Sequence, residues 1–146
     1  MAVVGKSDKA NDGDSYEVYI NKAGQPLSGI KAGYLNAKNF NEGMAFYKKP
    51  EFNEPVRYID KKGKEIFKSE SDKFYEHGDF SNGLAAVPNK EGKYGYINSK
   101  GKLVIPYLYS IPKTQYASVY TIAFDKNGTA RVMKDGKYIT IDKSGK

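Results

Sequence analysis

The sequence of 146 residues contains no cysteine and no tryptophan, and it has a single histidine. Without cysteine, the chain can form neither a disulfide nor a thiolate zinc site from its own residues. Its apolar fraction is 39%, below the roughly 45–50% of typical soluble domains, and no apolar run is long enough to span a bilayer. Residues 1–6 lack the charged segment and apolar stretch of a signal peptide. These absences exclude cysteine chemistry and a transmembrane helix within this sequence.

Aromatic side chains offset the shortage of other apolar residues, because the chain has 13 tyrosines and 7 phenylalanines. Tyrosine combines an apolar ring with a polar tip and suits half-buried surfaces. Aromatic residues also favour pleated strands, and the 15 glycines are typical of a chain with many tight turns. The composition therefore predicts β-structure with frequent turns.

One pattern recurs four times along the chain: an isoleucine, then an asparagine or aspartate, then a glycine three residues further on. The copies begin at Ile20, Ile59, Ile97 and Ile141. The asparagine or aspartate side chain can accept a hydrogen bond from the backbone two residues on, and glycine adopts the positive φ that closes such a hairpin. We therefore predict structural turns at four glycines, which are Gly24, Gly63, Gly101 and Gly145.

A second pattern, a phenylalanine followed by a glycine turn and an alanine, begins at Phe40, Phe80 and Phe124. Together the two patterns predict a single β-repeat domain over residues 16–146, with units at residues 16–39, 40–79, 80–123 and 124–146. We expect residues 1–15 to form a flexible N-terminal arm and the polar connector 68–79 to cross the surface. The predicted fold is all-β, with antiparallel β-hairpin repeats stacked as a solenoid-like, barrel-like or propeller-like array.

No return strand follows the fourth turn, because the sequence stops at Lys146. Two explanations are open at this point. The sequence can be a piece of a longer array, or residues 2–4 (Ala-Val-Val) can supply the missing strand and close the repeats into a ring.

The central unit reads FSNGLAAV over residues 80–87 and KYGYINSKGKLVIP over residues 93–106. It resembles the bacterial tryptophan-glycine (WG) repeat family, whose units read approximately F-x-x-G-L-A-x-V and then K-W-G-Y-I-D-x-x-G-K-x-V-I-P. Tyr94 stands in the tryptophan position. The resemblance covers roughly residues 16–27 and 40–146. It implies an all-β repeat fold, often secreted or envelope-associated in bacteria, and no established catalytic residue.

The titratable residues do not form a recognisable catalytic or metal-binding pattern. His77 lies in an acidic connector, and a single histidine in a polar loop is expected to be solvated rather than to act as a ligand or base. Four glutamates that could serve as paired glycosidase carboxylates are expected instead to balance neighbouring lysines; they are Glu42, Glu51, Glu54 and Glu65. We therefore predict no catalytic residue, no metal site and no cofactor.

Three tyrosines, Tyr19, Tyr58 and Tyr96, each precede the isoleucine of the turn pattern by one residue. Successive residues of a strand point to opposite faces, so if the isoleucines face the core, these tyrosines line an outer surface. There they could stack on sugar rings or contact a protein. The alternative is that they pack against neighbouring strands without any ligand.

The net charge of +7 arises in residues 80–146. Six basic residues are candidates for contacts with an anionic partner; they are Lys93, Lys100, Lys102, Arg131, Lys134 and Lys137. We therefore expect a non-catalytic interaction module that binds a protein partner or an anionic or polysaccharide polymer. A purely structural spacer is the alternative, and nucleic acid is disfavoured because the lysines lie mostly in turns.

Overall fold

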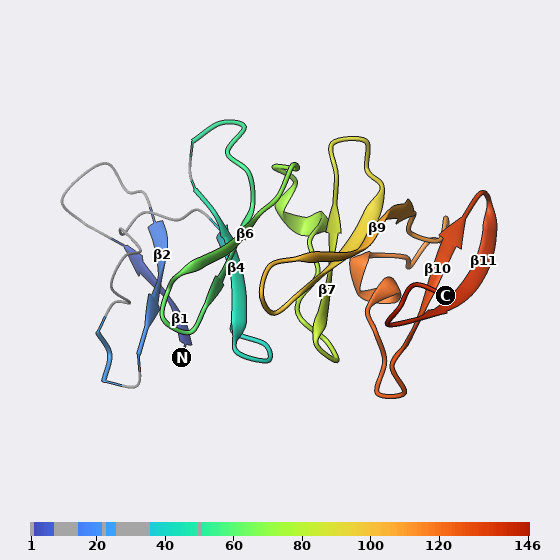
Figure 1. The fold of residues 1–146 in the computed structure, drawn as a ribbon. Coiled ribbons are helices and arrows are strands. Elements are labelled where there is room, and N and C mark those ends of the chain that lie inside the picture. The colour runs from blue at the N-terminus through green and yellow to red at the C-terminus, as the bar shows by residue number, and fades with distance from the viewer. Residues whose placement is uncertain (1, 8–14, 22, 26–35, 50) are drawn as a thin grey trace.

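Four antiparallel β-sheets follow one another along the chain in the computed structural model (Figure 1). The structure describes residues 2–7, 15–21, 23–25, 36–49 and 51–146. The sheets lie in a row, and the N- and C-termini are at opposite ends of it (Figure 1). The predicted all-β class with antiparallel hairpins is thereby confirmed.

Each sheet is made of strands that are adjacent in sequence. The first sheet contains β1 (Ala2–Ser7) and β2 (Ser15–Ile20). The second contains β3 (Asn36–Ala37), β4 (Met44–Lys48), β5 (Arg57–Asp60) and β6 (Glu65–Lys68). The third contains β7 (Leu84–Pro88), β8 (Tyr94–Asn98) and β9 (Leu103–Tyr109). The fourth contains β10 (Thr129–Lys134) and β11 (Lys137–Asp142).

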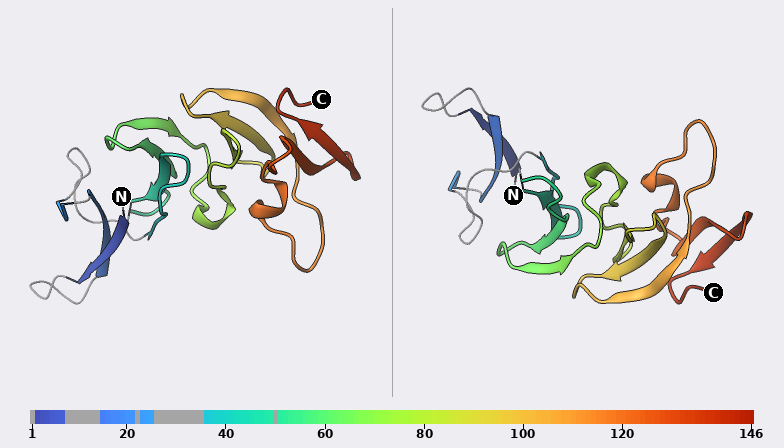
Figure 2. Two further views of the ribbon diagram at one scale, coloured as in Figure 1. Left: turned by 90° about the horizontal axis from the view of Figure 1, so that it is seen from below. Right: turned by 90° about the horizontal axis from the view of Figure 1, so that it is seen from above.

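Two short 3₁₀ helices lie in the long connectors that precede the third and fourth sheets. They are η1 (Phe74–Glu76) and η2 (Val119–Ile122). With three and four residues, neither is long enough to cross a bilayer. Both project from the same side of the row, opposite β6 and β9 (Figure 2).

The first residues of the chain do not close the repeats into a ring. Strand β1 pairs with β2, and Ala2 lies opposite Ile20. The hypothesis that residues 2–4 complete the fourth unit is therefore wrong, because these residues already have a partner strand in the first sheet. Of the expected flexible arm, residues 2–7 belong to this hairpin, and residues 8–14 lie outside the described residues.

The turns predicted from the sequence share one set of hydrogen bonds. In the turn at Asp60, its Oδ1 accepts the backbone N–H groups of Lys62 and Lys64 at 2.8 and 3.0 Å, and the Gly63 N–H donates to the Asp60 carbonyl at 2.9 Å. The same bonds recur in the turns that begin at Asn21, Asn98 and Asp142. The glycines have φ between 76° and 81°, as such a turn requires. Two further turns of this kind begin at Asn89 and Asp125.

The hydrophobic core is divided into three layers, each between two consecutive sheets. We call these layers the first, second and third joints. The first contains Tyr19, Ala45, Tyr47 and Ile59. The second contains Phe46, Val56, Tyr58, Phe74, Phe80, Ala85, Val87 and Ile97. The third contains Leu84, Ala86, Tyr94, Tyr96, Ile105, Tyr109, Val119, Ile122, Phe124, Ala130, Val132 and Ile141. The second and third sheets are thus buried on both faces.

One glycine shows how closely the sheets approach. A Cβ added to Gly101, in the turn of the third sheet, would overlap the backbone carbonyl oxygen of Ile66 in β6 of the second sheet. Only glycine allows backbone to approach backbone so closely at positive φ. This turn therefore also docks the third sheet onto the second.

Candidate functional site

The three tyrosines predicted to line an outer surface are buried. Tyr19, Tyr58 and Tyr96 expose 1%, 0% and 0% of their surface, so the prediction of an exposed tyrosine row is wrong. They do point away from the adjacent isoleucines, because Tyr58 and Ile59 belong to different joints. The face opposite the isoleucines is nevertheless covered by the next sheet.

Each of these tyrosines donates its hydroxyl to a backbone carbonyl near the end of its own unit, just before the next unit begins. Tyr19 donates to Lys38 at 2.9 Å, Tyr58 to Gly78 at 2.8 Å and Tyr96 to Ile122 at 2.7 Å. In every case the acceptor lies two residues before the phenylalanine of the second sequence pattern. The same device therefore links each pair of consecutive sheets.

The tyrosine ring also meets that phenylalanine edge to face. The ring centroids are 5.2 Å apart for Tyr19–Phe40, 6.0 Å for Tyr58–Phe80 and 5.0 Å for Tyr96–Phe124, with interplanar angles of 71°, 81° and 73°. Edge-to-face contacts of this kind add to the stabilisation from burial alone. The tyrosine row is thus a structural feature that fixes the stacking of the sheets.

The outward face of the fourth sheet has a different composition. Thr140 stands where the tyrosine would be, and it is exposed. Arg131, opposite Thr140, is also exposed, and its guanidinium lies 4.8 Å from the ring centroid of Tyr138. This face therefore presents a cation and an aromatic ring to solvent.

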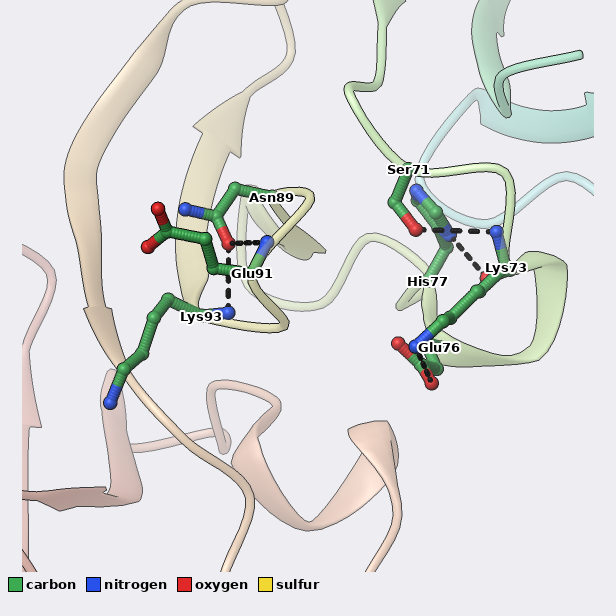
Figure 3. A network of polar contacts seen from close by, with 7 residues as sticks. All are labelled: Ser71, Lys73, Glu76, His77, Asn89, Glu91 and Lys93. Atoms are coloured by element: carbon green, nitrogen blue, oxygen red, sulfur yellow. Dashed lines mark hydrogen bonds and ion pairs between the residues drawn. The ribbon is translucent and has the colours of Figure 1, made fainter. Parts of the chain in front are cut away.

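The single histidine is buried in the second joint, so its expected position in a solvated loop is wrong. His77 is 1% exposed and lies within the connector network drawn in Figure 3. Its Nδ1 is 2.9 Å from the Lys73 carbonyl, which can only accept, so Nδ1 carries the proton. Nε2 then accepts the Ser69 hydroxyl at 2.7 Å. Burial lowers the pKa of His77 to about 4.

A hydroxyl bonded to a histidine resembles a nucleophile and its base, but this pair is closed to a substrate. Ser69 is 4% exposed, and its Oγ also accepts the Ser71 N–H at 3.1 Å. A carbonyl rather than a carboxylate orients the histidine. In the described ranges, no three His, Asp or Glu side chains form a possible metal site.

Three of the four glutamates considered as paired carboxylates, Glu42, Glu54 and Glu65, have structural partners. The two oxygens of Glu42 accept the backbone N–H groups of Asn82 and Gly83 at 2.7 and 2.8 Å, which links the second and third sheets. Glu54 and Glu65 both bind Arg57, at 2.9 and 2.8 Å. The carboxylates of Glu42, Glu54 and Glu65 are thus engaged in structural contacts.

The structure does not gather the six candidate basic residues into one patch. Lys93 precedes β8, whereas Lys100 and Lys102 follow it in the next turn, so they lie at opposite ends of one strand. Arg131, Lys134 and Lys137 belong to the fourth sheet, where Lys134 and Lys137 face each other beside the β10–β11 turn.

Two pockets adjoin the fourth sheet. One, of about 410 Å³, is lined by Pro112, Thr114, Ala117, Thr121, Arg131 and Tyr138. The other lies between two turns and is lined by Asn82, Lys126, Asn127, Gly128, Asp142, Lys143 and Ser144. In the second pocket, Lys143 already donates to the Asn82 side chain at 2.6 Å. In the first pocket, Arg131 has no ion pair with a described residue.

Exposed aromatic side chains gather on the two long connectors. Tyr75 in η1 is 79% exposed, and Tyr116 and Tyr120 in the second connector are 84% and 54% exposed. Both connectors lie on the same side of the row (Figure 2). Lys38, which precedes β4, donates to the Tyr120 hydroxyl at 3.0 Å, and this bond raises the pKa of Lys38. We call Lys38, Tyr75, Tyr116 and Tyr120 the connector face.

Comparison with family models gives a match to the WG containing repeat. Three segments match it, at residues 57–94, 94–110 and 118–138, and together they cover just over half of the chain. The chain belongs to the WG-repeat family. Searches of curated proteins and of solved structures found no match.

The WG dipeptide position has a clear role in this WG-repeat chain. Tyr94, in the tryptophan position, is buried in the third joint, and its hydroxyl has no hydrogen-bond partner among the described residues. A Cβ on the following Gly95 would lie 2.6 Å from the Ile105 carbonyl oxygen, where the β8–β9 register shifts. The dipeptide thus places a large ring in the joint and lets the return strand close over it.

The sequence reasoning missed the pocket beside Arg131, the buried histidine and the connector face of this WG-repeat chain. Signals for two of them were present. Arg131 is one of only two arginines in the chain, and Tyr75, Tyr116 and Tyr120 lie outside the repeated patterns. An aromatic residue that does not belong to either repeated sequence pattern is a candidate for an exposed position. No comparable signal distinguished His77 from a solvated histidine.

Proposed function

We propose that this WG-repeat chain is a non-catalytic interaction module whose sheets form an open, solenoid-like stack. The row of sheets with distant termini supports an open array over a barrel or propeller. The burial of the Ser69–His77 pair and the structural roles of Glu42, Glu54 and Glu65 favour a non-catalytic function. In this module the stacked sheets position the connector face for contact with a partner.

The observation that carries this proposal is the connector face. Exposed tyrosines are enriched where proteins bind partners, because the ring packs against apolar surface while the hydroxyl stays hydrated. Three such rings lie on two connectors at the same side of the stack. The partner we propose is a protein or an extracellular polymer, in line with the basic surface of residues 80–146.

The proposal is tested with an array of acidic oligosaccharides, neutral oligosaccharides and peptides, probed with the labelled chain. A triple variant, Tyr75→Ser, Tyr116→Ser and Tyr120→Ser, is expected to weaken the binding at least about tenfold, which is about 1.4 kcal/mol. Phe52→Ser is the matched control, because Phe52 is 94% exposed but lies in the β4–β5 loop. Contacts through the rings should persist as salt is raised, whereas long-range charge attraction should weaken.

A structural spacer is the second candidate, and the tyrosine joints favour it. Side chains that fix sheet stacking maintain the length and straightness of a stack without any ligand. A spacer predicts no binding to any member of the array, and the triple variant then has no effect. Nucleic acid is less favoured, because the basic residues lie at opposite ends of β8 and do not form one stripe.

A further inference from the structure

The pocket beside Arg131 and Tyr138 combines chemistry from two parts of the chain. Arg131 on β10 and Tyr138 on β11 come from the outward face of the fourth sheet, and Pro112, Thr114, Ala117 and Thr121 come from the second connector. Its volume of about 410 Å³ lies within the range of small-molecule sites, about 300–1,000 Å³. The lining offers one guanidinium, one phenol ring and two hydroxyls.

The two arginines of the chain differ in their partners. Arg57 is paired with two carboxylates, since its Nη2 lies 2.9 Å from Glu54 and its Nη1 lies 2.8 Å from Glu65. Arg131 has no ion pair with any described residue, and its guanidinium lies over the ring of Tyr138. A guanidinium presents five N–H donors in a planar fork that matches a carboxylate. The edge of Arg131 is therefore available to an anion from outside the chain.

The lining of the pocket includes no acidic residue. Between Glu91 and Asp125 the sequence contains no aspartate or glutamate, and the four connector residues that line the pocket fall within this stretch. The local charge is complementary to an anionic ligand.

We propose that this pocket binds the carboxylate of a sugar-acid residue within an acidic polysaccharide, a proposal that rests on the interaction-module function. Arg131 binds the carboxylate, and Tyr138 holds the guanidinium plane in place through the cation–π contact. Thr121, whose hydroxyl donates to the Ser118 carbonyl at 2.6 Å, keeps its oxygen available to accept a sugar hydroxyl.

The geometry favours a sugar acid over an acidic peptide. Peptides commonly gain affinity by pairing their backbone with a free strand edge or by placing a helix in an apolar groove. Arg131 and Tyr138 instead project from the face of the sheet, and the rest of the pocket is formed by a connector. Pro112 and Ala117 add apolar surface against which a sugar ring can pack, and the threonine hydroxyls suit its polar rim.

The experiment measures dissociation constants by calorimetry, with trigalacturonate as the acidic probe and its methyl ester as the neutral one. Arg131→Gln is expected to weaken trigalacturonate binding at least tenfold, and the ester should bind the unaltered chain weakly. Arg131→Lys is expected to restore only part of the affinity, because an ammonium lacks the planar fork. Lys134→Gln is the matched control: it removes one positive charge from the same strand but not from the pocket lining, so its effect should stay within twofold.

Three outcomes would overturn the site. They are no saturable binding of trigalacturonate up to about 10 mM, equal affinity for acid and ester, or equal effects of Arg131→Gln and Lys134→Gln. Triglutamate binding as tightly, with the same dependence on Arg131, would replace the polysaccharide with an acidic peptide. These results distinguish the pocket proposal from the interaction-module proposal. If binding to the array depends on the connector tyrosines and persists in Arg131→Gln, the pocket proposal is wrong but the interaction-module proposal still holds.

Discussion

The second and third joints use the same device in different surroundings. In both, a tyrosine hydroxyl donates to a backbone carbonyl and its ring meets a phenylalanine edge to face. In the second joint the residue before the acceptor carbonyl is His77, which is buried. In the third joint the corresponding residue is Thr121, which is exposed. One joint thus contains a buried titratable group beside its central bond, and the other does not.

This difference shows that the stacking geometry depends on few positions. The tyrosine, the phenylalanine and the carbonyl set the approach of the sheets, while the flanking connector residues differ between joints. In a repeat protein the stability is approximately a sum of units and nearest-neighbour interfaces. Each joint can therefore be weakened on its own, which makes the comparison open to test.

The largest expected effect comes from breaking the second joint at Gly101. Gly101→Ala brings a Cβ into the Ile66 carbonyl, and we expect a loss of at least about 4 kcal/mol in the free energy of unfolding, measured by denaturant titration. Gly92→Ala is the control, because Gly92 has a similar φ of 75° in the same sheet but open space around it. It should lose only about 1–2 kcal/mol, the strain of the left-handed conformation.

The counterpart in the third joint should respond more mildly. A Cβ on Gly145 would meet the Ile105 side chain at 3.3 Å rather than backbone, and a side chain can move. Gly145→Ala should therefore resemble Gly92→Ala. Equal losses for Gly101→Ala and Gly145→Ala would contradict the idea that backbone approach is specific to the second joint.

The next effect is a pH dependence confined to the second joint. His77 has a folded pKa of about 4 against 6.5 when unfolded, because burial disfavours its charged form, while the Lys73 carbonyl and Asp72 oppose the shift. Well above pH 6.5, His77 is neutral in both the folded and the unfolded chain, so its full contribution to stability is present. As the pH falls from 6.5 to 4, the unfolded chain binds a proton that the folded chain does not, so stability falls. The loss is about 3 kcal/mol, at about 1.4 kcal/mol per unit of pKa.

This pH dependence is measured as the free energy of unfolding between pH 4 and pH 7.5. His77→Gln should remove most of the slope, even though it changes the stability at neutral pH. Thr121→His places a histidine at the corresponding exposed position of the third joint and should add little slope. A variant lacking His77 that kept the full slope would show that carboxylates, not this histidine, dominate the acid response.

The turns were predictable from the sequence because they are local. A side-chain oxygen that caps two N–H groups and a glycine at positive φ act within five residues, so Asp60 and Gly63 carry the whole signal. Pairing of consecutive strands follows from such turns. Nothing local specifies what covers the outer face of a hairpin, so the choice between solenoid, barrel and propeller did not follow from the pattern.

The tyrosine row shows this limit directly. Alternation correctly placed Tyr58 and Ile59 on opposite faces, but it does not say whether a second sheet covers the other face. A clue was available in β7, which reads Leu-Ala-Ala-Val-Pro and is buried throughout. Continuous apolar strands are typical of sheets buried on both faces. The prediction that His77 is solvated failed for a related reason, because the sequence of a polar connector does not show that a hydrophobic joint lies beneath it.

The smallest expected effect separates two tyrosines on one strand. Tyr96 and Tyr94 are both buried in the third joint, but only the Tyr96 hydroxyl has a partner, the Ile122 carbonyl. Tyr96→Phe should cost about 1–2 kcal/mol, because it leaves a buried carbonyl unsatisfied, whereas Tyr94→Phe should be neutral or slightly stabilising, because it removes an unpaired buried hydroxyl. Tyr58→Phe should match Tyr96→Phe if the second and third joints are equivalent at this bond. Thermal and denaturant unfolding of the three variants measure this, and a loss for Tyr94→Phe as large as that for Tyr96→Phe would mean that ring packing, rather than the inter-sheet hydrogen bond, distinguishes these positions.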